Sequence, residues 1–152
     1  MNDKILGFLK SQTAASICCI TENNEPYAFS CFYAFQEKDS LLHFKSGTST
    51  YHSQILLKNP LVSGTIMPDK LNKLATKGIQ FSGIALAETD SLCVDAFKTY
   101  HSKFPLALAI KGIMWTIKLA QLKMTDNIGG IFRKHTWQRG EQDVLGFDQN
   151  QH

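Results

Sequence analysis

The sequence predicts a mainly β protein in which six antiparallel strands form a sheet or small barrel with peripheral helices. Six segments are rich in β-branched and aromatic residues, and most are separated by turns of hairpin length. Helical patterns occur only at the N-terminus and after the third and fifth strands, an order that fits a barrel better than a doubly wound sheet. The 152 residues suit one domain, and 43% hydrophobic residues with 19% charged residues is an ordinary globular composition.

The first part of the chain predicts a helix followed by a β-hairpin. Residues 2–10 have an Asn or Asp cap and a single apolar stripe, which is typical of a short amphipathic helix. Residues 14–21 are rich in β-branched and small apolar side chains and predict the first strand. The turn at 22–25 contains two Asn residues, which tolerate the positive φ of a tight turn. Pro26 opens the next strand, where a missing N–H is harmless.

The second strand, residues 27–36, alternates strictly between two faces. One face is bulky and consists of Tyr27, Phe29, Cys31, Tyr33 and Phe35. The other face is mostly small and consists of Ala28, Ser30, Phe32, Ala34 and Gln36. Small residues on a strand leave room for another backbone or a flat ligand, or they simply allow close sheet packing; both interpretations stay open.

Turn residues separate the elements that follow. In chain order these are strand 41–45, helix 51–58, strand 61–67, strand 78–87, a helix that 89–91 caps and Pro105 stops, and strand 113–125, which we expect to bend. Residues 126–137 then combine two glycines with a basic run. One domain therefore spans residues 1–140, and the polar residues 141–152 predict a disordered tail.

The small net charge of +3 conceals an uneven distribution. Residues 111–139 hold six basic side chains and one acidic side chain, whereas the rest of the chain is slightly acidic. This excess suits one small anion and falls short of a nucleic-acid-binding domain, so that we expect no nucleic-acid partner.

No segment of the sequence predicts export, a membrane span or a metal site. The first ten residues carry three charges and lack the apolar core of a signal peptide. Lys111 and Lys118 interrupt the most apolar stretch, 105–122, well before the roughly 20 apolar residues that a span needs. The four cysteines lack the spacing of a zinc site and predict buried free thiols. We therefore expect a cytoplasmic protein with no membrane or metal partner.

The segment 41–58 carries the clearest chemical signal. A strand ends, a glycine and four hydroxyl residues follow, and a helix begins, so free N–H groups and the positive end of the helix dipole converge. This arrangement is typical of phosphate binding, with Lys45 and His52 as sources of positive charge. An ordinary Ser/Thr helix cap has the same pattern and stays open as the alternative. Of the other histidines, we expect His43 to be packed or solvated and His101 to be solvated.

Three segments together resemble a known family. They are Thr50-Tyr51-His52, Gly78-Ile79-Gln80-Phe81-Ser82-Gly83, and Thr125-Asp126-Asn127 with Gly130, Lys134 and Trp137. Over roughly residues 1–140 the chain resembles the FMN-binding split barrels of the pyridoxamine 5'-phosphate oxidase-like superfamily, and within it a small bacterial subfamily of uncharacterised function. The fold class that this resemblance implies is a six-stranded antiparallel split β-barrel with peripheral helices.

The resemblance also implies a homodimer with two FMN sites at the subunit interface. The backbone near Phe32 and Tyr33 would border the flavin ring, and Gln80 would reach a flavin from the other subunit or strand. Lys134 and Trp137 would close the site. The ribityl chain and phosphate would meet Lys45, Ser46, Gly47, Thr50, Tyr51 and His52.

Two departures from the family pattern limit what the resemblance implies. Relatives usually place Arg or Lys where this chain has Tyr51 and His52, which predicts weaker FMN binding or a different cofactor. The chain also lacks the C-terminal Arg-x-His pattern of true pyridoxamine phosphate oxidases, so that reaction is not expected. We expect an FMN-dependent oxidoreductase of unknown substrate with no catalytic residue identified. The alternative is a non-enzymatic protein that stores or senses flavin, haem or another anionic ligand.

Overall fold

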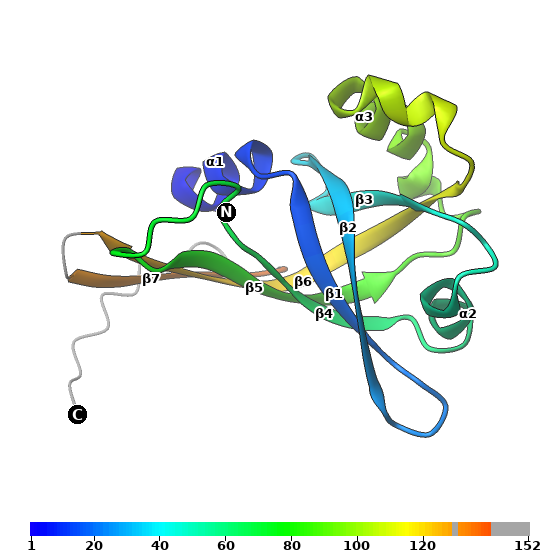
Figure 1. The fold of residues 1–152 in the computed structure, drawn as a ribbon, viewed down its shortest axis with the longest axis horizontal. Coiled ribbons are helices and arrows are strands. Elements are labelled where there is room, and N and C mark those ends of the chain that lie inside the picture. The colour runs from blue at the N-terminus through cyan, green and yellow to red at the C-terminus, as the bar shows by residue number, and fades with distance from the viewer. Residues whose placement is uncertain (129–130, 141–152) are drawn as a thin grey trace.

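The computed structural model describes residues 1–128 and 131–140, which form one sheet with flanking helices. Its strands follow the order β3-β2-β1-β4-β5-β6-β7, all neighbours are antiparallel, and β3 also pairs with β6 (Figure 1). The strands are β1 (Ala14–Ile20), β2 (Pro26–Gln36), β3 (Leu41–Ser46), β4 (Leu61–Ile66), β5 (Lys77–Ala85), β6 (Ile113–Ile128) and β7 (Ile131–Gln138). The β3–β6 pairing closes the first six strands into a ring, which confirms the barrel, and β7 lies outside it.

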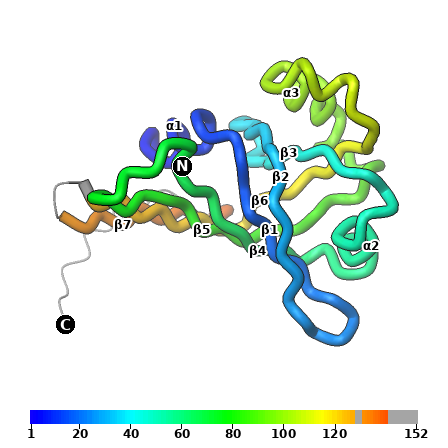
Figure 2. The backbone as a smooth tube through the Cα atoms, viewed as in Figure 1, coloured from blue at the N-terminus to red at the C-terminus, as the bar shows by residue number. Residues whose placement is uncertain are grey.

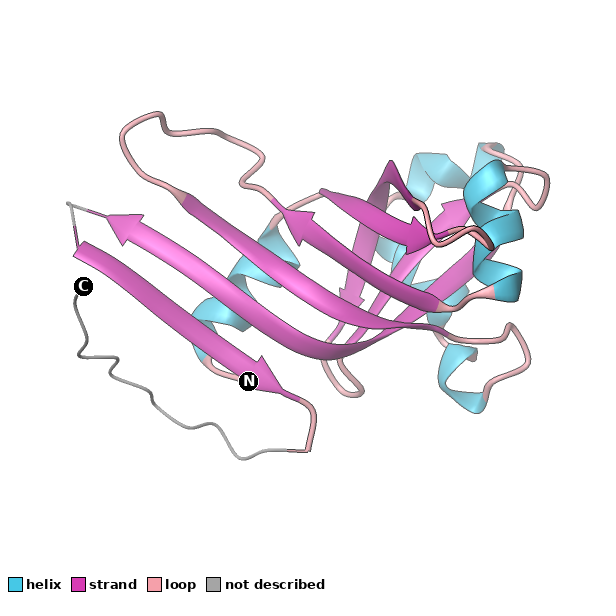
Figure 3. Ribbon diagram, turned by 90° about the horizontal axis from the view of Figure 1, so that it is seen from below, coloured by secondary structure: helices cyan, strands magenta, loops and turns pink. Residues whose placement is uncertain are grey.

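Strand β7 is the one strand that the sequence analysis lacks. It pairs with β6 from the Gln121–Gln138 pair to the Ile128–Ile131 pair. The hairpin of β6 and β7 extends away from the ring as a two-stranded arm, continued on one side by β5 (Figures 1 and 3). The neighbouring basic residues Arg133 and Lys134 lie on opposite faces of β7, so the segment lacks the regular apolar–polar alternation that predicts a strand.

The helices are α1 (Asp3–Ser11), α2 (Tyr51–Lys58) and α3 (Ala96–Lys103), with two 3-10 turns, η1 (Ser91–Cys93) and η2 (Pro105–Ala109). Helices α1 and α2 match their predictions. The single helix expected after residue 89 is instead divided into η1 and α3, since Asp90 caps η1 and the non-helical backbone of Asp95 separates η1 from α3. Pro105 stops α3, as expected, and also opens η2, where its fixed φ suits a first helical position.

The interior of the ring holds the main hydrophobic core. Apolar residues of α1, α2 and every strand of the ring fill it, and Trp115 belongs to it. A second, smaller core of Ala34, Tyr100 and Ala107 lies where α3 and η2 cover the outside of β2 and β3 (Figure 2). His101 is 7% exposed in this second core, so the expectation that it is solvated is wrong. The face of α3 that carries His101 packs on the sheet, and the rings of Phe97 and Tyr100 flank the imidazole.

Two local predictions about the backbone are confirmed. Asn24 has a φ of 61° in the β1–β2 turn, and Pro26 is the first residue of β2.

The β5–β6 register shifts at Gly83, where a bulge accommodates the curvature of the long sixth strand. A side chain there would approach Lys118 O to 2.6 Å, so this close crossing requires glycine.

The structure bears on the sequence-based expectations about a membrane span, a metal site and the cysteines. Across residues 1–128 and 131–140, no helix is long and apolar enough to cross a membrane. In the same ranges, no three His, Cys, Asp or Glu side chains gather as a metal site would need. The four cysteines are free thiols, but only Cys19 is buried and the others are half-buried. Burial raises the pKa of Cys31 to about 12, which makes that thiol a poor nucleophile. The predicted tail, 141–152, lies outside the described residues.

Candidate functional site

The start of helix α2 is built around the side chain of Thr50. This residue is the N-cap, with φ −68° and ψ 150°, and its hydroxyl accepts a hydrogen bond from Ser53 N. The chain arrives there from β3 through Gly47, whose carbonyl oxygen accepts bonds from the hydroxyls of Thr50 and Ser53. The first backbone N–H groups of α2 and its positive dipole end therefore lie beside a group of hydroxyls.

His52 joins these hydroxyls in what we call the hydroxyl cluster, formed by Ser46, Thr50, His52 and Ser53. The Nε2 atom of His52 lies 2.7 Å from Ser46 Oγ and 3.1 Å from Thr50 Oγ1. The imidazole stacks on Phe29, with ring centroids 3.9 Å apart and planes 9° apart. Burial lowers the pKa of His52 below its ordinary value, so the free site holds a neutral imidazole at pH 7.

Lys45 precedes the hydroxyl cluster but points to the other face of β3, because successive strand residues alternate. Its Nζ donates to Ala107 O at 2.9 Å and lies 3.3 Å from His101 Nε2. The Nδ1 atom of His101 is 2.9 Å from Phe97 O, so Nδ1 carries the proton and Nε2 accepts from the lysine. Lys45 therefore ties β3 to η2, and its ammonium group is engaged there.

Other predicted residues lie on the outside of the sheet, away from the core. Phe32 is 61% exposed and stacks on Phe104, and Gln80 on β5 and Lys134 on β7 are exposed. Between them runs a surface of small, exposed side chains, which we call the small-residue face. It consists of Ala28 and Ser30 on β2, Ser16 on β1, Ser63 and Thr65 on β4, and it ends at Gln80. Such a flat surface admits another backbone or a planar ligand.

One chain does not bring all the predicted residues together. Ser46 pairs with Ile113 and Lys134 pairs with Thr125, twelve positions further along β6. At about 3.3 Å per residue, roughly 40 Å of strand separates the two positions. Figure 1 shows α2 and β7 at opposite ends of the molecule.

The aromatic members of the predicted site have different environments. Trp137 lies on the opposite face of β7 from Lys134 and packs against the core, with the Arg139 guanidinium 5.5 Å from its ring. The Tyr33 ring is buried and its hydroxyl donates to Leu9 O at 2.8 Å, so only its backbone faces outward. Tyr51 is 53% exposed and packs edge-on against Tyr27.

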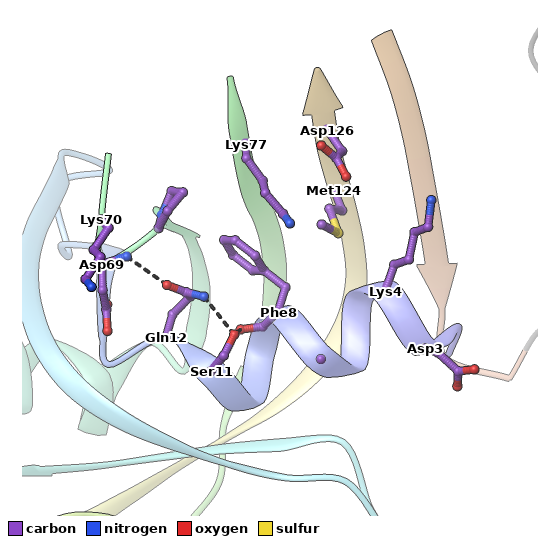
Figure 4. Close-up of a pocket in the computed structure, with 12 residues that line it drawn as sticks. Asp3, Lys4, Phe8, Ser11, Gln12, Asp69, Lys70, Lys77, Met124 and Asp126 are labelled. Carbon is purple, nitrogen blue, oxygen red and sulfur yellow. Dashed lines mark hydrogen bonds between the residues drawn. The ribbon is translucent and has the colours of Figure 1, made fainter. Parts of the chain in front are cut away.

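A separate cleft of about 750 Å³ lies between α1, residues 68–70 and the ends of β5 and β6 (Figure 4). None of the predicted cofactor residues lines it. Asp126 and Lys77 do, from facing positions on neighbouring strands. Asp126 belongs to the motif of residues 125–127, but the sequence indicates no role for it, because its position opposite Lys77 depends on the pairing of β5 with β6.

Comparisons with known proteins identify relatives by sequence. The chain is 33% identical over 135 residues to a UPF0306 protein of Yersinia pseudotuberculosis, covering 88% of this chain and 90% of that protein. It is 31% identical over 132 residues to a UPF0306 protein of Photorhabdus laumondii, covering 87% and 92%. No family model matches the chain.

Comparisons of the fold identify split barrels of low sequence identity. A haem-binding protein from Mycobacterium smegmatis superposes with a TM-score of 0.72 at 14% identity, covering 91% of this chain and 59% of that longer chain. A pyridoxamine 5'-phosphate oxidase-related, FMN-binding protein from Nostoc punctiforme has a TM-score of 0.60 at 11% identity, covering 93% and 86%. HutZ, the haem storage protein of Vibrio cholerae, has a TM-score of 0.64 at 14% identity, covering 83% and 94%. The fold is therefore the split barrel of the pyridoxamine 5'-phosphate oxidase-like proteins.

Proposed function

The chain belongs to the UPF0306 family, and we propose that it is an FMN-binding protein that holds the flavin phosphate at the start of α2. The observation that carries this proposal is the hydroxyl cluster of Ser46, Thr50, His52 and Ser53 beside the N-terminus of the helix. Hydroxyls and backbone N–H groups are hydrogen-bond donors that a phosphate monoester needs, and the positive end of the helix dipole favours its negative charge.

The Ser46 hydroxyl and the first backbone N–H groups of α2 are the donors at this site that suit a phosphate, because the hydroxyls of Thr50 and Ser53 already donate to Gly47 O. The charge of the site matches a phosphate only in part. A phosphate monoester carries about −1.5 to −2 charges at neutral pH. The neutral His52 is able to take up a proton when an anion arrives at its Nε2, which adds one positive charge at the site. Lys45 contributes little directly, because its ammonium group is bonded to Ala107 O on the other face of β3.

We propose further that the site is completed by a second copy of the chain in a homodimer. Gln80 and Lys134 are exposed on the outside of the arm, far from α2 of their own chain. The small-residue face offers a flat, exposed surface on which a second copy and the planar flavin ring both pack without side-chain obstruction. In a symmetric dimer, Lys134 of one copy would then supply charge to the phosphate at the other copy's α2.

Haem is the second candidate, because two of the similar split barrels are described as haem proteins. Haem iron is held by a side chain such as an exposed histidine. In the described ranges, all four histidines have Nε2 atoms that are either buried or already hydrogen-bonded. This arrangement favours FMN over haem.

Bound FMN would supply hydride or electron transfer, and we propose a flavin-dependent oxidoreductase whose substrate is unidentified. The chain's own part is to bind the phosphate, through the hydroxyl cluster, and to present the small-residue face to the ring. Among residues 1–128 and 131–140, we assign no side chain as an acid or base for a substrate.

The test is the absorption spectrum of the purified protein, followed by titration with FMN and with riboflavin. We expect FMN to bind at least about tenfold more tightly than riboflavin, since only FMN has the phosphate. Ser46→Ala should remove most of this preference, whereas Ser49→Ala, which changes an exposed hydroxyl in the same loop, should preserve it. Equal affinity for the two flavins, or haem uptake without flavin uptake, would contradict the proposal.

The shared site is tested by mixing two defective variants. A dimer of His52→Ala chains and a dimer of Lys134→Ala chains each have two damaged sites. Mixed dimers have one site with both changes and one intact site, so random exchange restores tight binding in about a quarter of all sites. Absence of recovery, or a monomer that binds FMN fully, would exclude the shared site.

A further inference from the structure

The cleft beneath α1 has features of a second binding site that is separate from the candidate FMN site. Phe8 of α1 and Met124 of β6 are buried and form an apolar part of its wall (Figure 4). Volumes of 300–1,000 Å³ are typical of small-molecule sites, and this cleft is about 750 Å³. The charged groups of the cleft indicate what it binds.

Asp126 is the unusual group in this cleft. It is only 7% exposed, and its Oδ1 atom is buried without a hydrogen-bond partner among the described residues. Asp69, a second carboxylate of the cleft, is by contrast satisfied, since Thr13 donates to its Oδ1 through both N and Oγ1. A buried carboxylate oxygen without a donor is costly to folding, which indicates that Asp126 is held for a ligand.

Positive groups surround Asp126 without pairing with it. Lys77 on β5 and Arg133 on β7 are its cross-strand neighbours on the same face. The Nζ atom of Lys77 lies 5.6 Å from the Phe8 ring centre, and Lys4 and Lys70 lie at the cleft wall. Within the described ranges, no ion pair joins Lys4, Lys70 or Lys77 to a carboxylate. Among the described residues, the cleft thus presents both a carboxylate oxygen without a hydrogen-bond donor and ammonium groups without an ion-pair partner.

We propose that this cleft binds a small zwitterion, an amino-carboxylate whose ammonium group pairs with Asp126 and whose carboxylate pairs with the lysines. Three lysines and three carboxylates (Asp3, Asp69 and Asp126) line the cleft, so its lining carries no net charge. A simple cation would leave the lysines unpaired, and a simple anion would leave Asp126 unsatisfied. A molecule with both charges satisfies both groups at once.

This site lies on a different face of the sheet from the candidate FMN site. Asp126 and Met124 point toward α1 and the core, whereas Lys134 and Gln80 lie on the exposed side of the same strands. Binding at one site therefore leaves the contacts of the other unchanged, and the two proposals fail or succeed independently.

The test uses amino-carboxylates of increasing length, namely β-alanine, 4-aminobutyrate and 6-aminohexanoate, each at up to about 10 mM. The readout is the ¹³C-labelled methyl resonance of Met124, which is 1% exposed and lies in the cleft wall. We expect one or more of these compounds to shift that resonance saturably. Butylamine and butyrate, which carry one charge each, should bind at least about tenfold more weakly.

Asp126→Asn keeps the shape of the side chain and removes its charge. We expect this variant to bind the zwitterion about 10- to 100-fold more weakly, to melt at the same or a higher temperature, and to bind FMN as before. Glu88→Gln, which removes an exposed carboxylate elsewhere, is the matched control and should bind normally. No saturable shift with any of the three compounds, undiminished binding to Asp126→Asn, or a clear loss of thermal stability in that variant would overturn the proposal.

Discussion

His43 should make the stability of this protein fall steeply in mild acid. The side chain is completely buried on β3, where its Nδ1 atom lies 3.0 Å from Thr116 Oγ1. The other ring nitrogen, Nε2, is buried without a partner among the described residues. Burial lowers the pKa of His43 to about 4, although the negative charge of Asp95 opposes this shift.

The direction of the effect follows from comparing the folded and unfolded chains. In the unfolded chain His43 takes up a proton near its ordinary pKa of about 6.5, whereas the folded protein takes it up only near 4. Between these values the unfolded state binds more protons, so the free energy of unfolding decreases as the pH falls. The loss attributable to His43 is about 2 kcal/mol at pH 5 and approaches about 3 kcal/mol below pH 4.

The assay is urea unfolding at one fixed protein concentration, at pH 7.5 and at pH 5. Between pH 7.5 and pH 5, we expect the free energy of unfolding to fall by about 2 kcal/mol less in His43→Asn than in the natural protein. This difference does not depend on the stability of the variant at pH 7.5. Thr116→Val is the matched control, because it removes the hydrogen-bond partner but keeps the histidine and hence the acid sensitivity. If His43→Asn loses stability as steeply as the natural protein, the reasoning about buried His43 is refuted.

Three further predictions concern packing and the candidate phosphate site. Gly64→Ala places a methyl group 2.5 Å from Ser16 O, and we expect it to destabilise the protein by about 1–3 kcal/mol in urea unfolding. Tyr33→Phe removes the bond to Leu9 O and should cost about 1 kcal/mol in the same assay; no change would show that this bond contributes nothing. Because the pKa of His52 is lowered in the free protein, a nearby phosphate should raise it, and FMN affinity should increase from pH 7.5 to pH 6 by at most about tenfold per pH unit. Fluorescence titration checks this, and riboflavin affinity, which involves no phosphate, should stay constant.

Local sequence signals predicted the elements whose ends depend on neighbouring residues. Thr50 set the start of α2 at Tyr51, since a hydroxyl cap stabilises the first turn wherever it occurs. The alternation of β2 identified its inward and outward faces, because side chains alternate along any strand. The hydroxyl cluster was also predictable from local sequence, because Ser46, Thr50 and His52 lie within seven residues of one another at the connection between β3 and α2.

Strand pairing and helix packing decided on which face several of the predicted residues lie. Lys134 and Trp137 were expected at one site, yet they are three positions apart on a strand and therefore lie on opposite faces. Recognising β7 as a strand would have separated them, but its basic composition lacks the apolar alternation that reveals strands. His101 was expected in water because it lies on the polar side of its predicted helix, but the packing of α3 on the sheet buries it.

The sequence by itself determined the mainly β class, the order of the first six strands along the chain, and the start of α2 with its hydroxyl residues, because these depend on contacts between near neighbours. Only the tertiary structure decided that β3 pairs with β6, that Lys45 is bonded to η2, and that Asp126 lies unpaired beneath α1. Each of these depends on which strands lie side by side and on how far each extends. Those are properties of the closed sheet as a whole, and no single segment specifies them.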